Sequence, residues 1–142
     1  MIVGLLLEHG ADVNTQAGEY GSALQAATSE GYVAVVRLLL GHRADVNTHG
    51  GSYRKSALYA ASSEGYEEIV RLLLENGADV GAQGGHYGNA LQAASSQGHD
   101  TIVHLLLSHG ADVDAVGGEY GVQLRPEARM RSFTCCWSTE LM

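Results

Sequence analysis

A short sequence recurs four times along this chain at a nearly constant interval, and this feature limits the possible folds most strongly. Three copies read Gly-Ala-Asp-Val and one reads Arg-Ala-Asp-Val; their alanines are Ala11, Ala44, Ala78 and Ala111. Successive copies are therefore 33, 34 and 33 residues apart. An interval of this size is typical of stacked supersecondary units, none of which can bury its apolar face alone. Such a stack favours an extended binding surface over a pocket for chemistry.

The composition argues against several classes of protein. The 142 residues are long enough for one domain, and the apolar share of 45% is ordinary for a soluble fold. The formal net charge of −8 argues against nucleic-acid binding, which needs clustered Lys and Arg. The apolar segment Ile2 to Leu7 is too short to span a membrane and lacks the flanks of a signal peptide. The adjacent Cys135 and Cys136 indicate no disulfide framework, so we expect a cytoplasmic or nuclear location.

The residues between two copies predict a pair of helices joined by a tight turn. Residues 56–62 are mostly small, with Ser56 placed to cap the first free backbone N–H groups and Gly65 placed to end the helix. Residues 67–75 carry a wide apolar arc at helical spacing, and Gly77 follows at a position that favours a positive φ. A hairpin-like connection then leads to the next unit.

The same unit repeats along the chain, which predicts an all-α solenoid. Further helices are expected at residues 22–28, 33–40, 89–95 and 100–107, and residues 2–7 match the second helix of a unit that lacks its first. The array is predicted to occupy residues 1–124, with a partial unit at 1–18, full repeats at 19–51, 52–85 and 86–118, and the start of a fourth at 119–124. We also predict that Leu39, Leu73 and Leu106 line up along one buried spine.

These units resemble ankyrin repeats, whose consensus contains Gly-x-Thr-Pro-Leu-His-x-Ala-Ala and ends in Gly-Ala-Asp-Val-Asn. The first full copy here reads Gly21-Ser22-Ala23-Leu24-Gln25-Ala26-Ala27 and ends in Ala44-Asp45-Val46-Asn47. The consensus histidine is replaced by Gln25, Tyr59 and Gln92, and Arg43 stands where the other units have glycine. If Arg43 is left-handed, it costs roughly 1 kcal/mol relative to glycine. The loop pattern Gly-Gly-x-Tyr-Gly is similar to ankyrin tracts of large fungal proteins, which often follow a nucleotide-binding NACHT domain.

The resemblance implies a protein–protein interaction module, a scaffold or adaptor without catalytic activity or cofactor. Its partners would meet the loop tips and the inner face of the first helices. On the helices the candidate residues are Ser29, Glu30, Ser63, Glu64, Ser96 and Gln97. At the loop tips they are Glu19, Arg54, Lys55, His86 and Glu119. As a group they would suit a protein with a basic or polar surface, and the array itself is expected to be monomeric.

One tyrosine per unit recurs in the connecting loops, namely Tyr20, Tyr53, Tyr87 and Tyr120. Two interpretations stay open. The rings could pack on one another and stiffen the stack of loops. They could instead form an aromatic edge for a partner, because tyrosine offers a large contact area at a small entropy cost.

Two other functions are compatible with the sequence. The chain could be a regulatory or sensor segment of a larger NTPase-type protein, present here as a truncated fragment, or a fragment without function. Residues 125–142 depart abruptly from the repeat and are expected to be poorly ordered; they would be either a gene-model artefact or a C-terminal cap. Pro126 falls where the first helix of a fourth unit should already be running.

No residue pattern indicates chemistry or a metal site. The seven histidines show no i,i+4 or cysteine-linked spacing, and His9, His42 and His109 fall at or beside helix ends, where an imidazole can meet free carbonyls. The loops lack the lysine and the strand–helix context of a phosphate-binding loop. The recurring aspartates Asp12, Asp45 and Asp79, like Asp112, are interpreted as turn residues.

Overall fold

The structure of this chain is a computed structural model, which describes residues 2–51, 56–85 and 87–113. The described part contains seven helices and one two-stranded hairpin. The helices are α1 (Ile2–Glu8), α2 (Ala23–Ser29), α3 (Val33–Gly41), α4 (Ala57–Glu64), α5 (Glu67–Glu75), α6 (Ala90–Gln97) and α7 (Asp100–Ser108). The strands β1 (Gln16–Ala17) and β2 (Gly21–Ser22) pair antiparallel in the first loop. The predicted helical solenoid is confirmed.

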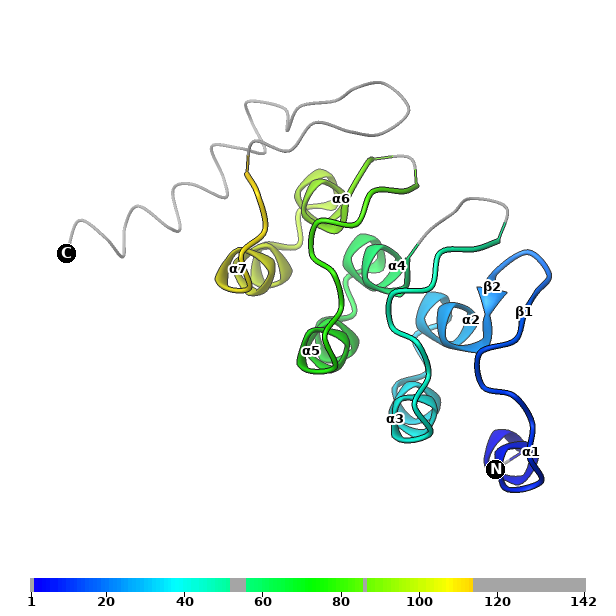
Figure 1. Ribbon diagram of the computed structural model, residues 1–142. Helices are drawn as coiled ribbons and strands as arrows, with labels where there is room; N and C mark the ends of the chain where they lie inside the picture. Colours follow the sequence, from blue (N-terminus) through cyan, green and yellow to red (C-terminus); the bar gives the residue numbers. More distant parts are fainter. Residues whose placement is uncertain (1, 52–55, 86, 114–142) are drawn as a thin grey trace.

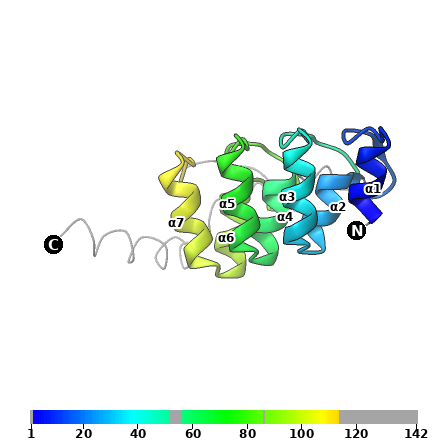
Figure 2. The same cartoon turned by 90° about the horizontal axis from the view of Figure 1, so that it is seen from below.

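The helices form two rows, as Figures 1 and 2 show. Helices α2, α4 and α6 stand side by side in one row, and α3, α5 and α7 stand in the other. Helix α1 continues the second row at its N-terminal end. The described parts of the loops project from the stack on the side where α2, α4 and α6 lie.

The first helix of each unit begins at a capping side chain. Ser22, Ser56 and Asn89 each accept a hydrogen bond from a backbone nitrogen three residues later, over 3.2, 3.1 and 2.9 Å. Such a bond satisfies one of the four backbone donors that a helix start leaves without an intrahelical partner. The cap predicted at Ser56 is confirmed, and Ser22 and Asn89 use the same device.

Left-handed residues end the helices where the repeat pattern requires a turn. Gly65 and Gly77 have φ angles of 87° and 85°, as predicted. Arg43 takes the equivalent position with a φ of 65°, and it is the one non-glycine residue with positive φ in the described part. Because an L-residue with a Cβ is strained there, this turn carries the cost that the sequence suggested.

One apolar cluster runs through the whole stack. Leu39, Leu73 and Leu106 are 1%, 0% and 0% exposed, and all three belong to this cluster, so the predicted spine is confirmed. The facing helices contribute a second row of leucines that are equally buried: Leu24, Leu58 and Leu91. Alternation of large leucines with small alanines lets the two rows of helices approach closely.

Three of the four recurring aspartates form turns, as predicted, and the turn at Asp112 stays a prediction. Asp12, Asp45 and Asp79 each accept a hydrogen bond at Oδ1 from the backbone nitrogen two residues later, over 2.9 Å in all three cases. An aspartate that bonds its own backbone in this way stabilises a turn without any ligand. The division into units at the predicted boundaries stays a prediction, and the predicted tail at 125–142 lies outside the described residues.

Candidate functional site

A hollow lies between the first hairpin loop, helix α2 and helix α4. It encloses about 300 Å³. Its lining residues are Glu19, Tyr20, Gln25, Ser29, Glu30, Gly50, Ser56, Ala60, Ser63 and Glu64, and we call it the acidic groove. The first loop and two neighbouring first helices therefore combine to form one concave site, on the side of the stack where Figure 1 shows the loops.

The floor of the acidic groove is held rigidly by the helix caps. Gln25 and Ser56 are only 4% and 6% exposed. The Gln25 side-chain oxygen accepts a hydrogen bond from the Ser22 backbone nitrogen over 2.8 Å, and the Ser56 hydroxyl accepts one from the Tyr59 nitrogen over 3.1 Å. Because these side chains are engaged in starting α2 and α4, the floor cannot rearrange without loosening both helices.

The rim of the acidic groove carries a concentration of negative charge. Glu19, Glu30 and Glu64 are exposed, and none of the lining residues that the structure describes is a lysine, arginine or histidine. Ser29 and Ser63 lie half-buried between the glutamates and offer hydroxyl groups. Three carboxylates around a partly enclosed hollow create a negative potential that attracts cations, although salt screens it.

Tyr20 connects the loop side of the groove to the end of α2. Its hydroxyl donates a hydrogen bond to Glu30 Oε1 over 3.3 Å, while the residue as a whole stays 49% exposed. The negative charge of Glu30 and this hydrogen bond raise the pKa of the Tyr20 hydroxyl above its ordinary value of 10.0. The contact places an aromatic face beside carboxylates, an arrangement that suits a cationic side chain.

The predicted binding residues divide into four groups. Six of them line the acidic groove together: Glu19, Tyr20, Ser29, Glu30, Ser63 and Glu64. Ser96 and Gln97 are exposed at the end of α6 and do not line it. Tyr87 is half-buried, and its backbone nitrogen donates to the Tyr59 hydroxyl over 3.0 Å. The remaining six lie outside the described residues: Tyr53, Arg54, Lys55, His86, Glu119 and Tyr120.

Sequence reasoning missed the floor of the groove. The sequence marks Gln25 only as a departure from a consensus and Ser56 only as a helix cap, and Ala60 is not among the predicted binding residues. Ala60 and Glu64 are four residues apart, which places them on the same face of a helix. That spacing is the signal for Ala60, whereas the approach of Gly50 to Gly21 of β2 depends on the loop conformation and has no signal in the sequence.

Other kinds of site find no support in the part of the chain that the structure describes. Within it, no three His, Cys, Asp or Glu side chains come together as a metal site would require. His9 and His109 instead place Nδ1 at 2.7 and 2.8 Å from the carbonyl oxygens of Leu5 and Leu105, as their position at helix ends predicted. None of the described helices has both the length and the apolar character needed to cross a membrane.

Comparison with known families agrees with the architecture. The family model described as ankyrin repeats (3 copies) matches residues 1–84 and again residues 55–117. These two matches together include all seven helices of the described part. A comparison with curated proteins gave no match.

Proposed function

This chain belongs to the ankyrin-repeat family, and from that membership we propose that the acidic groove binds another protein, so that the chain acts as an adaptor without catalytic activity. Ankyrin repeats are generally protein–protein interaction modules. The same groove would serve a free cytoplasmic adaptor and a regulatory segment of a larger NTPase-type protein, so the proposal concerns the binding step in either setting.

One observation carries the proposal: a concave site in which a rigid floor is surrounded by three carboxylates and an exposed tyrosine ring. The floor residues Gln25 and Ser56 are held by helix caps, so little conformational entropy is lost there on binding. The rim residues come from the first loop, α2 and α4, and a partner that fills the hollow must therefore contact two repeats at once.

The charge of the rim defines the chemistry of the partner. A lysine or arginine side chain would find Glu19, Glu30 and Glu64 at the edge of the hollow. Arginine suits it better, because its planar guanidinium group can pair with a carboxylate and stack on the Tyr20 ring. Attraction between opposite charges would also speed the encounter and make it sensitive to salt.

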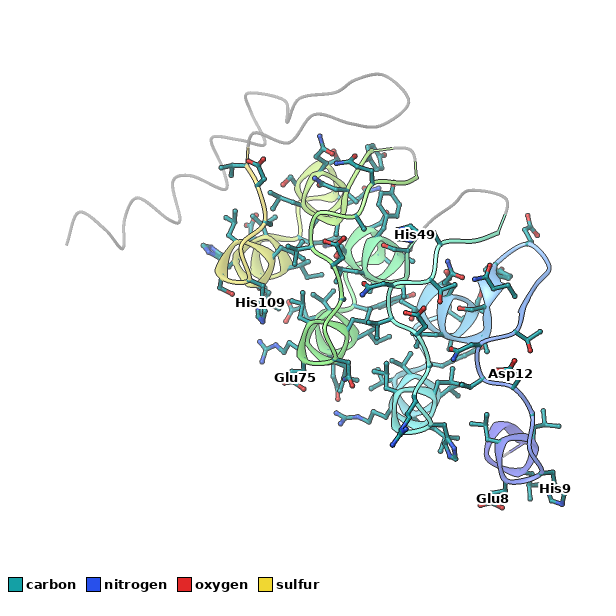
Figure 3. All side chains as sticks on the ribbon, viewed as in Figure 1. Glu8, His9, Asp12, His49, Glu75 and His109 are labelled. Atoms are coloured by element: carbon teal, nitrogen blue, oxygen red, sulfur yellow. The ribbon has the colours of Figure 1, made fainter. Side chains whose placement is uncertain are left out.

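The experiment compares the partners captured by three forms of the full chain. The groove variant carries Glu19→Gln, Glu30→Gln and Glu64→Gln, which removes the rim charge and keeps the side-chain shape. The matched control carries Glu8→Gln, Glu67→Gln and Glu75→Gln; these exposed residues of α1 and α5 do not line the groove, and Figure 3 shows Glu8 and Glu75 on the side of the stack opposite to the loops. All three forms should give the same helical circular dichroism spectrum.

We expect proteins captured by the native chain and the control to be lost with the groove variant. Each captured protein is then purified and titrated directly at two salt concentrations. Its affinity should fall at least tenfold with the groove variant and should weaken as salt increases. If the groove variant keeps all partners, or if both variants lose the same ones, the acidic groove is not the binding site.

A further inference from the structure

One asparagine of this chain is followed directly by glycine. The four asparagines are Asn14 and Asn47, which precede threonine, Asn89, which precedes alanine, and Asn76, which precedes Gly77. Because glycine has no Cβ atom, its backbone nitrogen can approach the side-chain carbonyl carbon of the asparagine before it. Asn76 and Gly77 are both exposed, and no atom of the described residues lies within 4 Å of a Cβ added at Gly77. This turn therefore has room for a ring to form and for water to enter.

The folded turn holds the two reacting groups in other hydrogen bonds. Asn76 caps the end of α5, and its Nδ2 donates to the carbonyl oxygen of Leu72 over 2.7 Å. The backbone nitrogen of Gly77 donates to the carbonyl oxygen of Leu74 over 3.1 Å. Both bonds must break before the nitrogen can attack the side chain. They lie at an exposed helix end, where local opening costs little free energy.

The other units carry histidine in place of this asparagine, namely His9, His42 and His109. His9 and His109 place Nδ1 at 2.7 and 2.8 Å from the carbonyl oxygen four residues earlier, the same kind of contact that Asn76 makes. An imidazole can thus end the helix as the amide does, but it has no carbonyl carbon that a backbone nitrogen could attack. The reactive group is therefore specific to the end of α5.

We propose that Asn76 and Gly77 form a deamidation site, and that the reaction uncouples the turn after α5 from the preceding repeat. This proposal is independent of the acidic groove. The Gly77 backbone nitrogen gives its proton to solvent and bonds to Asn76 Cγ. The Cγ–Nδ2 bond breaks, and the side-chain nitrogen takes up a proton and leaves as ammonia. One water molecule then opens the succinimide ring at either carbonyl, which yields aspartate or isoaspartate.

The product disturbs a turn that the preceding unit holds at two points. Asn47 donates from Nδ2 to the carbonyl oxygen of Gly77 over 3.2 Å, and its Oδ1 accepts from the backbone nitrogen of Asp79 over 2.7 Å. A carboxylate at position 76 cannot donate to the Leu72 carbonyl, and the dipole of α5 disfavours a negative charge at that end. Isoaspartate also adds one carbon to the backbone before Gly77. The turn then no longer presents both partners to Asn47.

The test follows the full chain at neutral pH and body temperature. Peptide mapping by mass spectrometry measures the gain of one mass unit at each asparagine, and isoaspartyl methyltransferase detects isoaspartate. We expect conversion at Asn76 and little at the other three asparagines. An unstructured peptide that copies residues 70–82 gives the reference rate, and the folded chain should react roughly tenfold more slowly because its turn must open first. The matched control, Asn76→His, should keep the melting temperature and show no conversion at this position.

Hydrogen exchange then tests the uncoupling. The modified chain is separated by ion exchange, since it carries one more negative charge. Its Asp79 amide should exchange about tenfold faster than in the unmodified chain, because the bond to Asn47 is lost. The Asp45 amide donates to Asn14 Oδ1 over 2.7 Å at the preceding junction, and it should keep its rate.

The proposed site would be excluded if Asn76 stayed unmodified after the peptide had been converted completely. It would also be excluded if the asparagines before threonine reacted to the same extent. An unchanged exchange rate at Asp79 in the modified chain would disprove the uncoupling. Equal acceleration at Asp79 and Asp45 would disprove it too, because the modification would then loosen the whole array and not one junction.

Discussion

The side-chain oxygen of Asn47 accepts a hydrogen bond from the backbone nitrogen of Asp79 over 2.7 Å, across the boundary between two repeats. Asn14 makes the same bond to Asp45 over 2.7 Å. Asn47 also donates from Nδ2 to the carbonyl oxygen of Gly77 over 3.2 Å. The turns of successive units are therefore joined by polar contacts as well as by the apolar cluster.

Asn47→Ala should lower the free energy of unfolding by about 1–2 kcal/mol, because it removes two exposed inter-repeat hydrogen bonds. Asn14→Ala, which removes the bond from the Asp45 backbone nitrogen at the edge of the stack, should cost about half as much. Urea denaturation followed by circular dichroism measures both. An equal or larger effect at Asn14 would contradict the role assigned to Asn47.

Leu73→Ala should lower the free energy of unfolding by about 2–5 kcal/mol, because Leu73 is 0% exposed at the centre of the stack and the substitution leaves a cavity. Leu5→Ala should change it by less than about 0.5 kcal/mol, since that side chain is mostly exposed. Differential scanning calorimetry of the two variants checks the contrast. Similar melting temperatures would be incompatible with a continuous core at Leu73.

Arg43→Gly should raise the free energy of unfolding by roughly 1 kcal/mol, because it relieves a left-handed backbone with a φ of 65°. Gly77→Ala should lower it by a similar amount at the equivalent turn, where no atom lies within 4 Å of an added Cβ and only backbone strain acts. Chemical denaturation of both variants provides the test. If both substitutions change the free energy of unfolding in the same direction, strain in the left-handed backbone does not explain the two effects.

Tyr59→Phe should cost about 1 kcal/mol, because it removes the acceptor for the Tyr87 backbone nitrogen while it keeps the buried ring. That ring lies against Gly85, where an added Cβ would be 2.5 Å from Tyr59 Cζ. Gly85→Ala should therefore destabilise the chain as well, because the added Cβ would collide with the Tyr59 ring and because a residue with a Cβ is strained at the φ of 75°. Hydrogen exchange at residue 87 should accelerate in Tyr59→Phe; unchanged protection there would disprove the contact.

The Tyr20 hydroxyl should titrate above its ordinary pKa of 10.0, and Glu30→Gln should move the pKa back toward that value. Since the folded state binds this proton more tightly than the unfolded state does, the associated stabilisation is present below pH 10 and is lost as the pH rises through the folded pKa. The ¹³Cζ resonance of Tyr20 reports the titration directly. A pKa that does not respond to Glu30→Gln would exclude Glu30 as the cause.

Most local features of the fold could be predicted from short-range chemistry. Ser56 was identified as a cap and Gly65 as a left-handed end because each acts within one turn of its own helix. The acidic groove was only half predicted. Glu30 and Glu64 were singled out from their place in the repeat, whereas Gly50 and Ala60 were not, because their part in the groove depends on how one loop lies against the next unit.

The sequence by itself determined the kind of unit, the number of helices in each unit and the leucines that form the spine, because a period near 33 residues and helical spacing of apolar side chains are properties of the chain alone. Only the tertiary structure decided that Tyr20 meets Glu30 and that a hollow forms between two repeats. These features depend on distances between units, and such distances follow from packing that no single repeat contains.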